Sequence, residues 1–154
     1  MRRFLFFFII LIALGSLLLF AGIWYEGYPG TEKGAAVSKV VIGGAVFIVD
    51  VADTPTTRTQ GLSGRPSLGE NEGMLFIFPE SDKPAFWMKD MNFALDMIWI
   101  GSDMHIVDIT ENALPESFPA TFSPKGNAQY VLEVNAHAAA NNGINIGDTV
   151  QFSK

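Results

Sequence analysis

The apolar run of residues 4–25, FLFFFIILIALGSLLLFAGIWY, constrains this chain more than any other feature, because it contains no charged side chain. A helix needs about 20 such residues to cross the hydrocarbon core of a bilayer. Arg2 and Arg3 are the only charges before the run, and positive charge is retained on the cytoplasmic side of a membrane. The run therefore predicts a single-pass inner-membrane anchor, with a cytoplasmic N-terminus and an extracytoplasmic (periplasmic) C-terminal domain.

A cleaved secretory signal is the alternative interpretation of the same run. Such signals usually have an apolar stretch of roughly 7–15 residues that ends in a small-x-small cleavage site. The best candidate, Phe20-Ala21-Gly22, places a large aromatic ring where a small residue is needed, and Trp24 and Tyr25 are typical of an interfacial anchor. We therefore favour an uncleaved anchor, and both interpretations place the rest of the chain outside the cytoplasm.

Composition divides the chain behind the anchor, which we assign to residues 1–25. Residues 26–38 are rich in glycine and small or polar residues, lack apolar periodicity, and predict a flexible tether. Residues 39–154 are enough for one domain with its own core and too few for two. The chain has no cysteine, which excludes thiol catalysis, thiolate metal sites and disulfide bonds.

Net charge limits the partners of this domain. The ten Lys and Arg residues include Arg2 and Arg3, which leaves eight in the rest of the chain against sixteen Asp and Glu. An acidic domain is repelled by phosphate, so we expect no nucleic-acid partner and no attraction to anionic membrane surfaces. The expected partners are the membrane, through the N-terminal helix, and a small-molecule, glycan or envelope-protein ligand. We expect no cofactor and no bound metal.

Short β-rich runs separated by turn signals dominate residues 39–154. Gly43-Gly44 predicts a tight hairpin within residues 39–51, and Asp53-Thr54-Pro55 predicts a capped helix that ends near Gly61 or Gly64. Further predicted elements are strands at 74–78, 85–88, 95–100, 105–110, 131–134 and 149–152, a short helix at 135–142, and a Pro-rich surface loop at 114–126. The pattern predicts a mostly β (α+β) fold, a small antiparallel β-barrel or sandwich with one or two short helices.

Four segments carry a family resemblance: GLSGRPSLGENEGMLFIF, FWMKDMNFALDMIWI, YVLEVNAH and GDTVQF, in this order and spacing. Together they resemble the bacterial and archaeal domain-of-unknown-function 192 (DUF192) family, from about Lys39 to Phe152. The resemblance implies a compact, mostly β domain, often behind a signal or anchor, with no established activity or cofactor.

The densest group of chemically useful side chains lies in residues 86–96. Successive strand residues point to opposite faces, so Trp87 and Lys89 are expected to be presented together. A Trp ring supplies apolar area and ions such as Lys89 and Asp96 supply orientation, which suits a sugar or peptide ligand. The structural alternative is that Trp87 covers the core while Lys89 pairs with Asp90 or Asp96.

Two arginines flank the glycines of residues 61–64. In such a turn, the guanidinium of Arg58 or Arg65 can clamp a carboxylate with two hydrogen bonds. That carboxylate is either a ligand's or the protein's own Asp96 or Glu133, and an internal tie is the more economical interpretation. Our candidate ligand site comprises Arg58, Arg65, Trp87, Lys89 and Asp96, and we assign no catalytic residue.

Two other functions compete with a binding module of the cell envelope. Asp90, Asp96 and Glu133 could supply the acid and base of a hydrolase that acts on envelope glycans, provided that two of them converge in a cleft. A copper-binding protein would need the thioethers of Met88 and Met91 to converge with His105. Core packing is the alternative role of these methionines and of Met74, Met97 and Met104.

Overall fold

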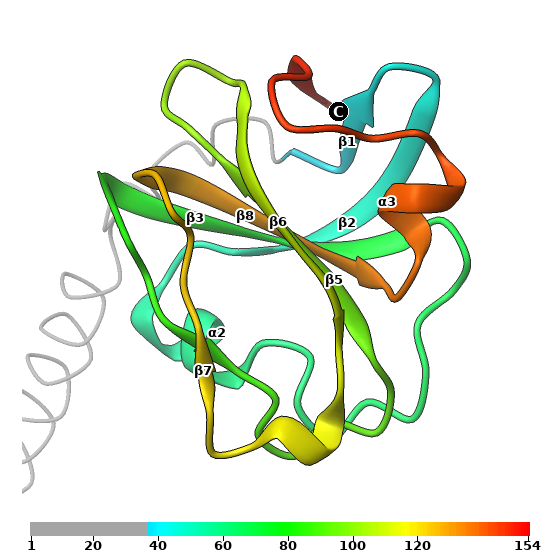
Figure 1. The fold of residues 1–154 in the computed structure, drawn as a ribbon, viewed down its shortest axis with the longest axis vertical. Coiled ribbons are helices and arrows are strands. Elements are labelled where there is room, and N and C mark those ends of the chain that lie inside the picture. The colour runs from blue at the N-terminus through cyan, green and yellow to red at the C-terminus, as the bar shows by residue number, and fades with distance from the viewer. Residues whose placement is uncertain (1–36) are drawn as a thin grey trace, which may run out of the picture. The chain divides into compact units, whose positions relative to one another are not determined.

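The computed structural model describes residues 37–154, so the predicted anchor and nearly all of the predicted tether lie outside the described residues. Within this part the chain is mostly β, with two α-helices and one 3-10 helix (Figure 1). The strands are β1 (Lys39–Ile42), β2 (Ala45–Ala52), β3 (Glu72–Asp82), β4 (Phe86–Trp87), β5 (Leu95–Ile100), β6 (Ile106–Ala113), β7 (Thr121–Phe122), β8 (Ala128–Asn135) and β9 (Val150–Ser153). The helices are α2 (Pro55–Gln60), η1 (Pro115–Ser117) and α3 (Ala138–Asn141). None of the helices described is long and apolar enough to cross a membrane.

Seven strands form one curled sheet in the order β6-β5-β8-β3-β2-β1-β9. The sheet is curled into a half-barrel. Its two edges are joined at a single antiparallel bridge, between His105 and Thr149. The predicted hairpin is confirmed, because Ile42 pairs with Ala45 across Gly43-Gly44 and Gly43 has the positive φ that such a turn requires.

The expectation of a purely antiparallel barrel or sandwich was wrong at one pair of strands. β2 and β3 run parallel, and α2 lies in the crossover between them. A parallel pair cannot be joined by a tight hairpin, so the chain must travel to the other end of the sheet between the two strands. This crossover carries residues 53–71 past the face of the sheet that holds the candidate site.

Hydrophobic residues pack on both faces of the central strands. One core cluster includes Phe47, Leu75, Ile98 and Leu132 together with residues of β1, β9 and α3. The other cluster includes Phe76, Met97, Trp99 and Val131 and extends to Leu62, Met88 and Phe86. All six residues of β5 are buried, which explains why the sequence LDMIWI shows no polar alternation.

The Pro-rich segment at 114–126 is more ordered than a simple loop. Pro115–Ser117 forms η1, and Thr121–Phe122 forms β7, which pairs with β4 in a separate two-stranded sheet. The prediction that this segment takes no central position in the main sheet is confirmed, because β7 lies outside it. Phe86 of β4 and Phe122 of β7 pack against the second core cluster.

Candidate functional site

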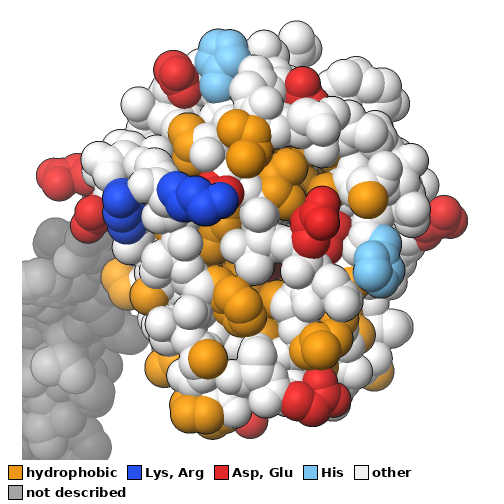
Figure 2. Space-filling model, in the orientation of Figure 1, with side chains coloured by type: hydrophobic (Ala, Val, Ile, Leu, Met, Phe, Trp, Pro, Cys, Tyr) orange, Lys and Arg blue, Asp and Glu red, His pale blue; other side chains and the backbone are white. Residues whose placement is uncertain are grey.

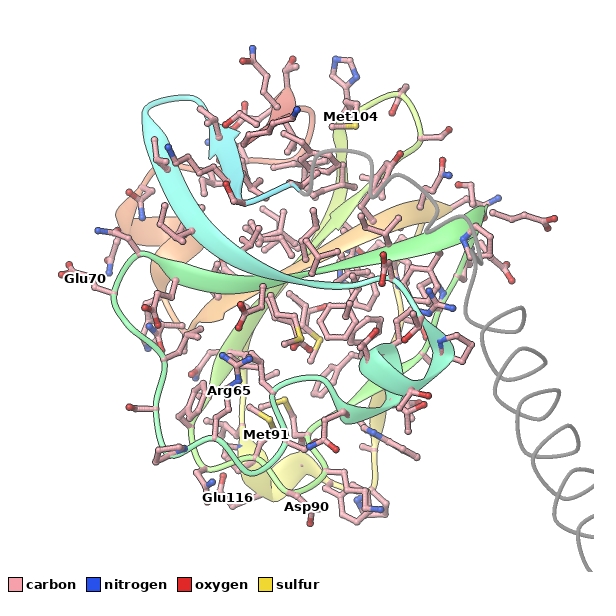
Figure 3. The ribbon with its side chains drawn as sticks, turned by 180° about the vertical axis from the view of Figure 1, so that it is seen from behind. Arg65, Glu70, Asp90, Met91, Met104 and Glu116 are labelled. Carbon is pink, nitrogen blue, oxygen red and sulfur yellow. The ribbon has the colours of Figure 1, made fainter. Side chains whose placement is uncertain are left out.

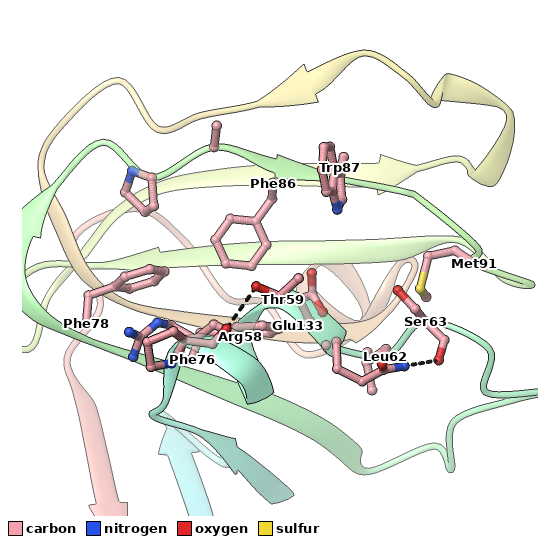
Figure 4. Close-up of a pocket in the computed structure, with 15 residues that line it drawn as sticks. Arg58, Thr59, Leu62, Ser63, Phe76, Phe78, Phe86, Trp87, Met91 and Glu133 are labelled. Atoms are coloured by element: carbon pink, nitrogen blue, oxygen red, sulfur yellow. Dashed lines mark hydrogen bonds between the residues drawn. The ribbon is translucent and has the colours of Figure 1, made fainter.

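A cavity of about 420 Å³ opens between the α2 segment and β4 (Figure 4). Its volume falls within the range of about 300–1,000 Å³ that is common for small-molecule sites. Phe78 lies at one end of the cavity and Met91 at the other, while Phe86 and Trp87 form the side opposite α2. The lining residues are Pro55, Arg58, Thr59, Gln60, Gly61, Leu62, Ser63, Phe76, Phe78, Pro84, Ala85, Phe86, Trp87, Met91 and Glu133.

Local sequence signals fix the α2 side of the cavity. The Thr54 side chain accepts a hydrogen bond from the Thr57 backbone N–H, and the Thr57 hydroxyl accepts one from the Thr54 backbone N–H, which together form a capping box. Gly61 ends the helix with a φ of 51°, and a Cβ at this position would lie 3.3 Å from the Phe76 ring. Glycine therefore lets the chain turn sharply and pass directly over an aromatic ring of the core.

Aromatic packing fixes the opposite side. The Phe86 ring meets those of Phe76, Phe78 and Trp99 edge to face, with centroids 4.8, 6.2 and 5.3 Å away. Such edge-to-face pairs are favourable, so Phe86 anchors β4 to the sheet. Its neighbour Trp87 also lines the cavity and is 49% exposed.

Three hydrogen bonds tie the segment after α2 to the segment after β4. The Gly64 N–H donates to the Asp90 carbonyl at 2.8 Å, the Ser63 hydroxyl donates to the Lys89 carbonyl, and the Asn92 amide donates to the Arg65 carbonyl. These bonds hold the two sides of the cavity together at the end where Met91 lies.

Glu133 is the acidic residue of the cavity lining, and it is 5% exposed. In the sheet it lies between Met74 of β3 and Met97 of β5, both buried, so its side chain emerges from an apolar surface. No donor in residues 37–154 bonds its carboxyl oxygens. Every fully enclosed polar side-chain atom in these residues has a hydrogen-bond partner, so the carboxyl oxygens of Glu133 are not fully enclosed, and they open onto the cavity. Burial raises the pKa of Glu133 to about 8, so this carboxyl is mostly protonated at neutral pH.

Arg58 lies at the same end of the cavity as Phe78. Its Nη1 donates to the carbonyls of Asp53 at 2.6 Å and Ile77 at 2.8 Å, and its guanidinium carbon lies 5.2 Å from the centre of the Phe78 ring. These contacts join α2 to β3 and hold the guanidinium in one place. The predicted partners Asp96 and Glu133 were wrong, because Arg58 bonds backbone carbonyls; the internal arginine–carboxylate tie is formed instead by Arg65, with Asp50.

The structure brings two of the five predicted site residues, Arg58 and Trp87, to this cavity. Lys89 lies outside the lining, with its Nζ 6.0 Å from the centre of the Trp87 ring, and it forms no ion pair within the described part of the chain. Arg65 pairs with Asp50 at 2.7 Å and lines a different, smaller pocket.

Asp96, the fifth predicted residue, lies on the opposite face of the sheet from Glu133. It pairs with Val134 across β5 and β8, while Glu133 pairs with Met97, so the two carboxyls point to opposite sides. Asp96 is fully buried and accepts hydrogen bonds from the backbone N–H groups of Asn112 at 2.8 Å and Ala139 at 3.0 Å. Its carboxylate therefore connects β6 and α3 to β5 and does not face the cavity.

The geometry demanded by the two alternative functions is absent from the described residues. Of the three carboxyls proposed for hydrolysis, Glu133 alone lines the cavity, since Asp96 faces away and Asp90 is exposed outside the lining. The predicted copper ligands are also separated, because His105 lies at the corner where β6 meets β9 while Met88 and Met91 pack in the second core cluster.

The remaining methionines divide between the two cores. Met74 and Met97 join the second cluster, whereas Met104 packs against the first, at the far end of the domain from Met91 (Figure 3). No three His, Asp or Glu side chains in residues 37–154 are grouped so that they could share a metal ion.

The aromatic lining and the position of Glu133 at the cavity were not predicted from the sequence. Phe76, Phe78 and Phe86 were visible only as strand residues, because no local signal says which core rings border a cavity. The signal for Glu133 was present: it is the one charged residue in the apolar run 131–134. A charge inside a strand of the core marks either an internal partner or a site.

Comparisons with known proteins agree with this fold. The family model DUF192, described as "Uncharacterized ACR", matches residues 38–152. A solved structure of a proposed transcription regulator from Sinorhizobium meliloti 1021 is 34% identical, with a TM-score of 0.69 over 74% of this chain and 90% of the other. A protein of unknown function from Novosphingobium aromaticivorans DSM 12444 is 33% identical, with a TM-score of 0.71 over 79% of this chain and 89% of the other. No curated protein matches the chain.

Proposed function

We propose that this chain, which belongs to the DUF192 family of unknown function, is a non-catalytic binding module of the cell envelope that takes a small amphipathic ligand. The observation that carries the proposal is the Glu133 carboxyl, which lies buried at an aromatic-lined cavity, is mostly protonated at neutral pH and has no hydrogen-bond partner within residues 37–154. A buried polar group normally has a hydrogen-bond partner. A ligand that donates to or accepts from Glu133 would supply one.

The rest of the lining supports an amphipathic ligand. Phe76, Phe86, Trp87 and Leu62 offer apolar area, while the hydroxyls of Thr59 and Ser63 already serve backbone carbonyls. Apolar walls with a few fixed polar groups are typical of small-molecule sites. One carboxyl in the cavity does not supply the acid and base pair that the hydrolase alternative requires.

Native mass spectrometry of the full chain, released from lipid nanodiscs, tests this proposal. Thr59 points into the cavity (Figure 4), whereas Thr56 lies on the same helix outside the lining, so Thr59→Trp and Thr56→Trp form a matched pair. We expect wild type and Thr56→Trp to retain the same small-molecule mass and Thr59→Trp to lose it. A wild-type chain without added mass, or an adduct that survives Thr59→Trp, would contradict the proposal.

We further propose that residues 4–25 hold the domain on the extracytoplasmic side of the inner membrane, as their length and flanking arginines favour. To test this, alkaline phosphatase is fused to the C-terminus, because this enzyme becomes active only outside the cytoplasm. We expect an active fusion in the membrane fraction, and an inactive fusion or a released, shortened chain would contradict the anchor.

The Sinorhizobium protein is described as a proposed transcription regulator, and the surface charge of this domain argues against such a role here. Figure 2 shows acidic side chains around much of one face of the domain, with Lys and Arg gathered in one small area. Duplex DNA attracts basic surfaces and repels acidic ones. We propose that nucleic acid is no partner, and retarded migration of a DNA duplex by the full chain at 50 mM salt would contradict this.

A further inference from the structure

Arg58 is the basic residue of the cavity lining, and it has no acidic partner among residues 37–154. This is unexpected in a chain in which acidic residues outnumber basic ones by sixteen to ten. Arg65, a few residues further on, shows the usual arrangement, with its Nη2 2.7 Å from Asp50. The cavity therefore contains a fixed positive charge that the described protein does not neutralise.

The contacts of Arg58 leave one edge of its guanidinium unused. Both protein hydrogen bonds come from Nη1, and they hold the group against Asp53 and Ile77. The Phe78 ring lies against the guanidinium, 5.2 Å from centroid to carbon. Nε and Nη2 donate to no acceptor in the described structure, and this pair of nitrogens forms the fork that matches the two oxygens of a carboxylate.

Glu133 does not neutralise this charge. Its carboxyl forms no ion pair with Arg58, and its raised pKa keeps it mostly uncharged at neutral pH. The other residues that line the cavity carry no ionisable side chain, so the cavity has a net charge of about +1. A ligand with a single negative charge would balance it.

We propose that the ligand is a small organic monocarboxylate with an apolar or aromatic body, whose carboxylate binds the Nε–Nη2 edge of Arg58 and whose body lies along Phe86, Trp87 and Met91. This inference rests on the proposed function and specifies its ligand class. The apolar body accounts for the aromatic lining, and the single charge accounts for a guanidinium that forms no ion pair within residues 37–154.

The test compares three probes of nearly equal size and shape: 4-phenylbutanoate, 4-phenylbutanamide and 4-phenylbutylamine. Each is titrated calorimetrically into the full chain in lipid nanodiscs at pH 6.5, where Glu133 is uncharged. We expect the carboxylate to bind at least tenfold more tightly than the amide, and the amine to bind least. Arg58→Gln should remove the preference for the carboxylate, while Arg65→Gln, a matched change outside this cavity, should preserve it.

Arg58 also joins α2 to β3, so Arg58→Lys serves if Arg58→Gln fails to fold. The lysine keeps the charge but loses the fork, and we expect at least a threefold weaker preference for the carboxylate. Equal binding of carboxylate and amide would overturn this inference while leaving the cavity a binding site. A carboxylate preference that survives both Arg58 variants would also overturn it. Loss of all probe binding in Thr59→Trp but not in Thr56→Trp tests the cavity itself.

Discussion

Two buried carboxyls on neighbouring strands of the same sheet have opposite surroundings. Asp96 of β5 points to the face that carries α3 and receives two backbone N–H donors, from Asn112 and Ala139. Glu133 of β8 points to the other face, between Met74 and Met97, and receives none in the described structure. Burial alone therefore does not tell a structural acid from a site acid, and the difference lies in the partners.

The comparison also predicts opposite effects on stability. A carboxylate that accepts two buried N–H groups stabilises the fold, because its removal leaves both donors without a partner. A carboxyl that must be protonated to stay buried costs free energy, because its unfolded form ionises at a much lower pH. Replacement of Asp96 should therefore lower the free energy of unfolding, and replacement of Glu133 should raise it at neutral pH.

Replacement of Asp96 should have the largest effect. Asp96→Ala leaves the N–H groups of Asn112 and Ala139 unpaired, and we expect the free energy of unfolding to fall by about 3–5 kcal/mol. Asp96→Asn keeps one acceptor and should cost less. Urea denaturation of the full chain measures both variants. A loss below about 1 kcal/mol in Asp96→Ala would show that water replaces the carboxylate and would remove the contrast with Glu133.

Replacement of Glu133 should act in the opposite direction. The pKa of this carboxyl is raised from 4.5 to about 8, so between these pH values the folded protein holds a proton that the unfolded chain has lost. Stability due to this group is complete below pH 4.5 and declines as the pH rises towards 8. Glu133→Gln has no proton to lose, so at pH 7 we expect it to be more stable than wild type by about 3 kcal/mol.

The pH dependence separates this effect from ordinary repacking. The stability difference between Glu133→Gln and wild type should disappear near pH 4.5 and be fully developed above pH 8. Urea denaturation across this range measures it. A difference that does not change with pH would show that Glu133 has an ordinary pKa and an unrecognised partner, and the contrast with Asp96 would fail.

Ligand binding should depend on the same proton. Arg58 and Glu133 are the ionisable groups of the cavity lining, and Lys89 lies beside it over Trp87. Ionisation of Glu133 above pH 8 would add a negative charge and oppose a carboxylate ligand. We expect the affinity for 4-phenylbutanoate to fall about tenfold between pH 6.5 and pH 9, which is about 1.4 kcal/mol. Glu133→Gln should bind equally at both pH values, and a parallel loss in this variant would assign the effect to another group.

Local chemistry predicted most of the elements correctly. The Gly43-Gly44 hairpin, the helix capped by Thr54 and ended by Gly61, and the run at 95–100 all depend on signals within a few residues. The parallel pairing of β2 with β3 has no such signal, because it depends on which strand the chain reaches after the crossover. Strand pairing across distant segments is set by the packing of the whole sheet.

The contrast between Asp96 and Glu133 was equally hidden from the sequence. The two donors to Asp96 lie 16 and 43 residues further along the chain, so no spacing could indicate them. All six residues of β5 are buried, so alternation could not show which face Asp96 occupies. Arg58 and Trp87, chosen as candidate ligand-binding residues because a cation and a large aromatic ring combine with many ligands, both line the cavity, and their role in binding stays a prediction.

The smallest effects are expected at the rim of the cavity, where Trp87 is half exposed. Its ring contacts Phe118 edge to face at 6.2 Å, and the Nζ of Lys89 lies over it. Trp87→Ala should cost about 1 kcal/mol or less in stability and weaken 4-phenylbutanoate binding about fivefold, since the ring covers the ligand without anchoring the fold.

Lys89→Ala, the control next to it, should change neither the stability nor the affinity by a measurable amount, because an exposed ammonium contributes little. Calorimetry and urea denaturation of the two variants decide this. A Trp87→Ala chain that loses several kcal/mol of stability would place Trp87 with Asp96 among the structural residues, and the division of the molecule into a structural face and a binding face would no longer hold.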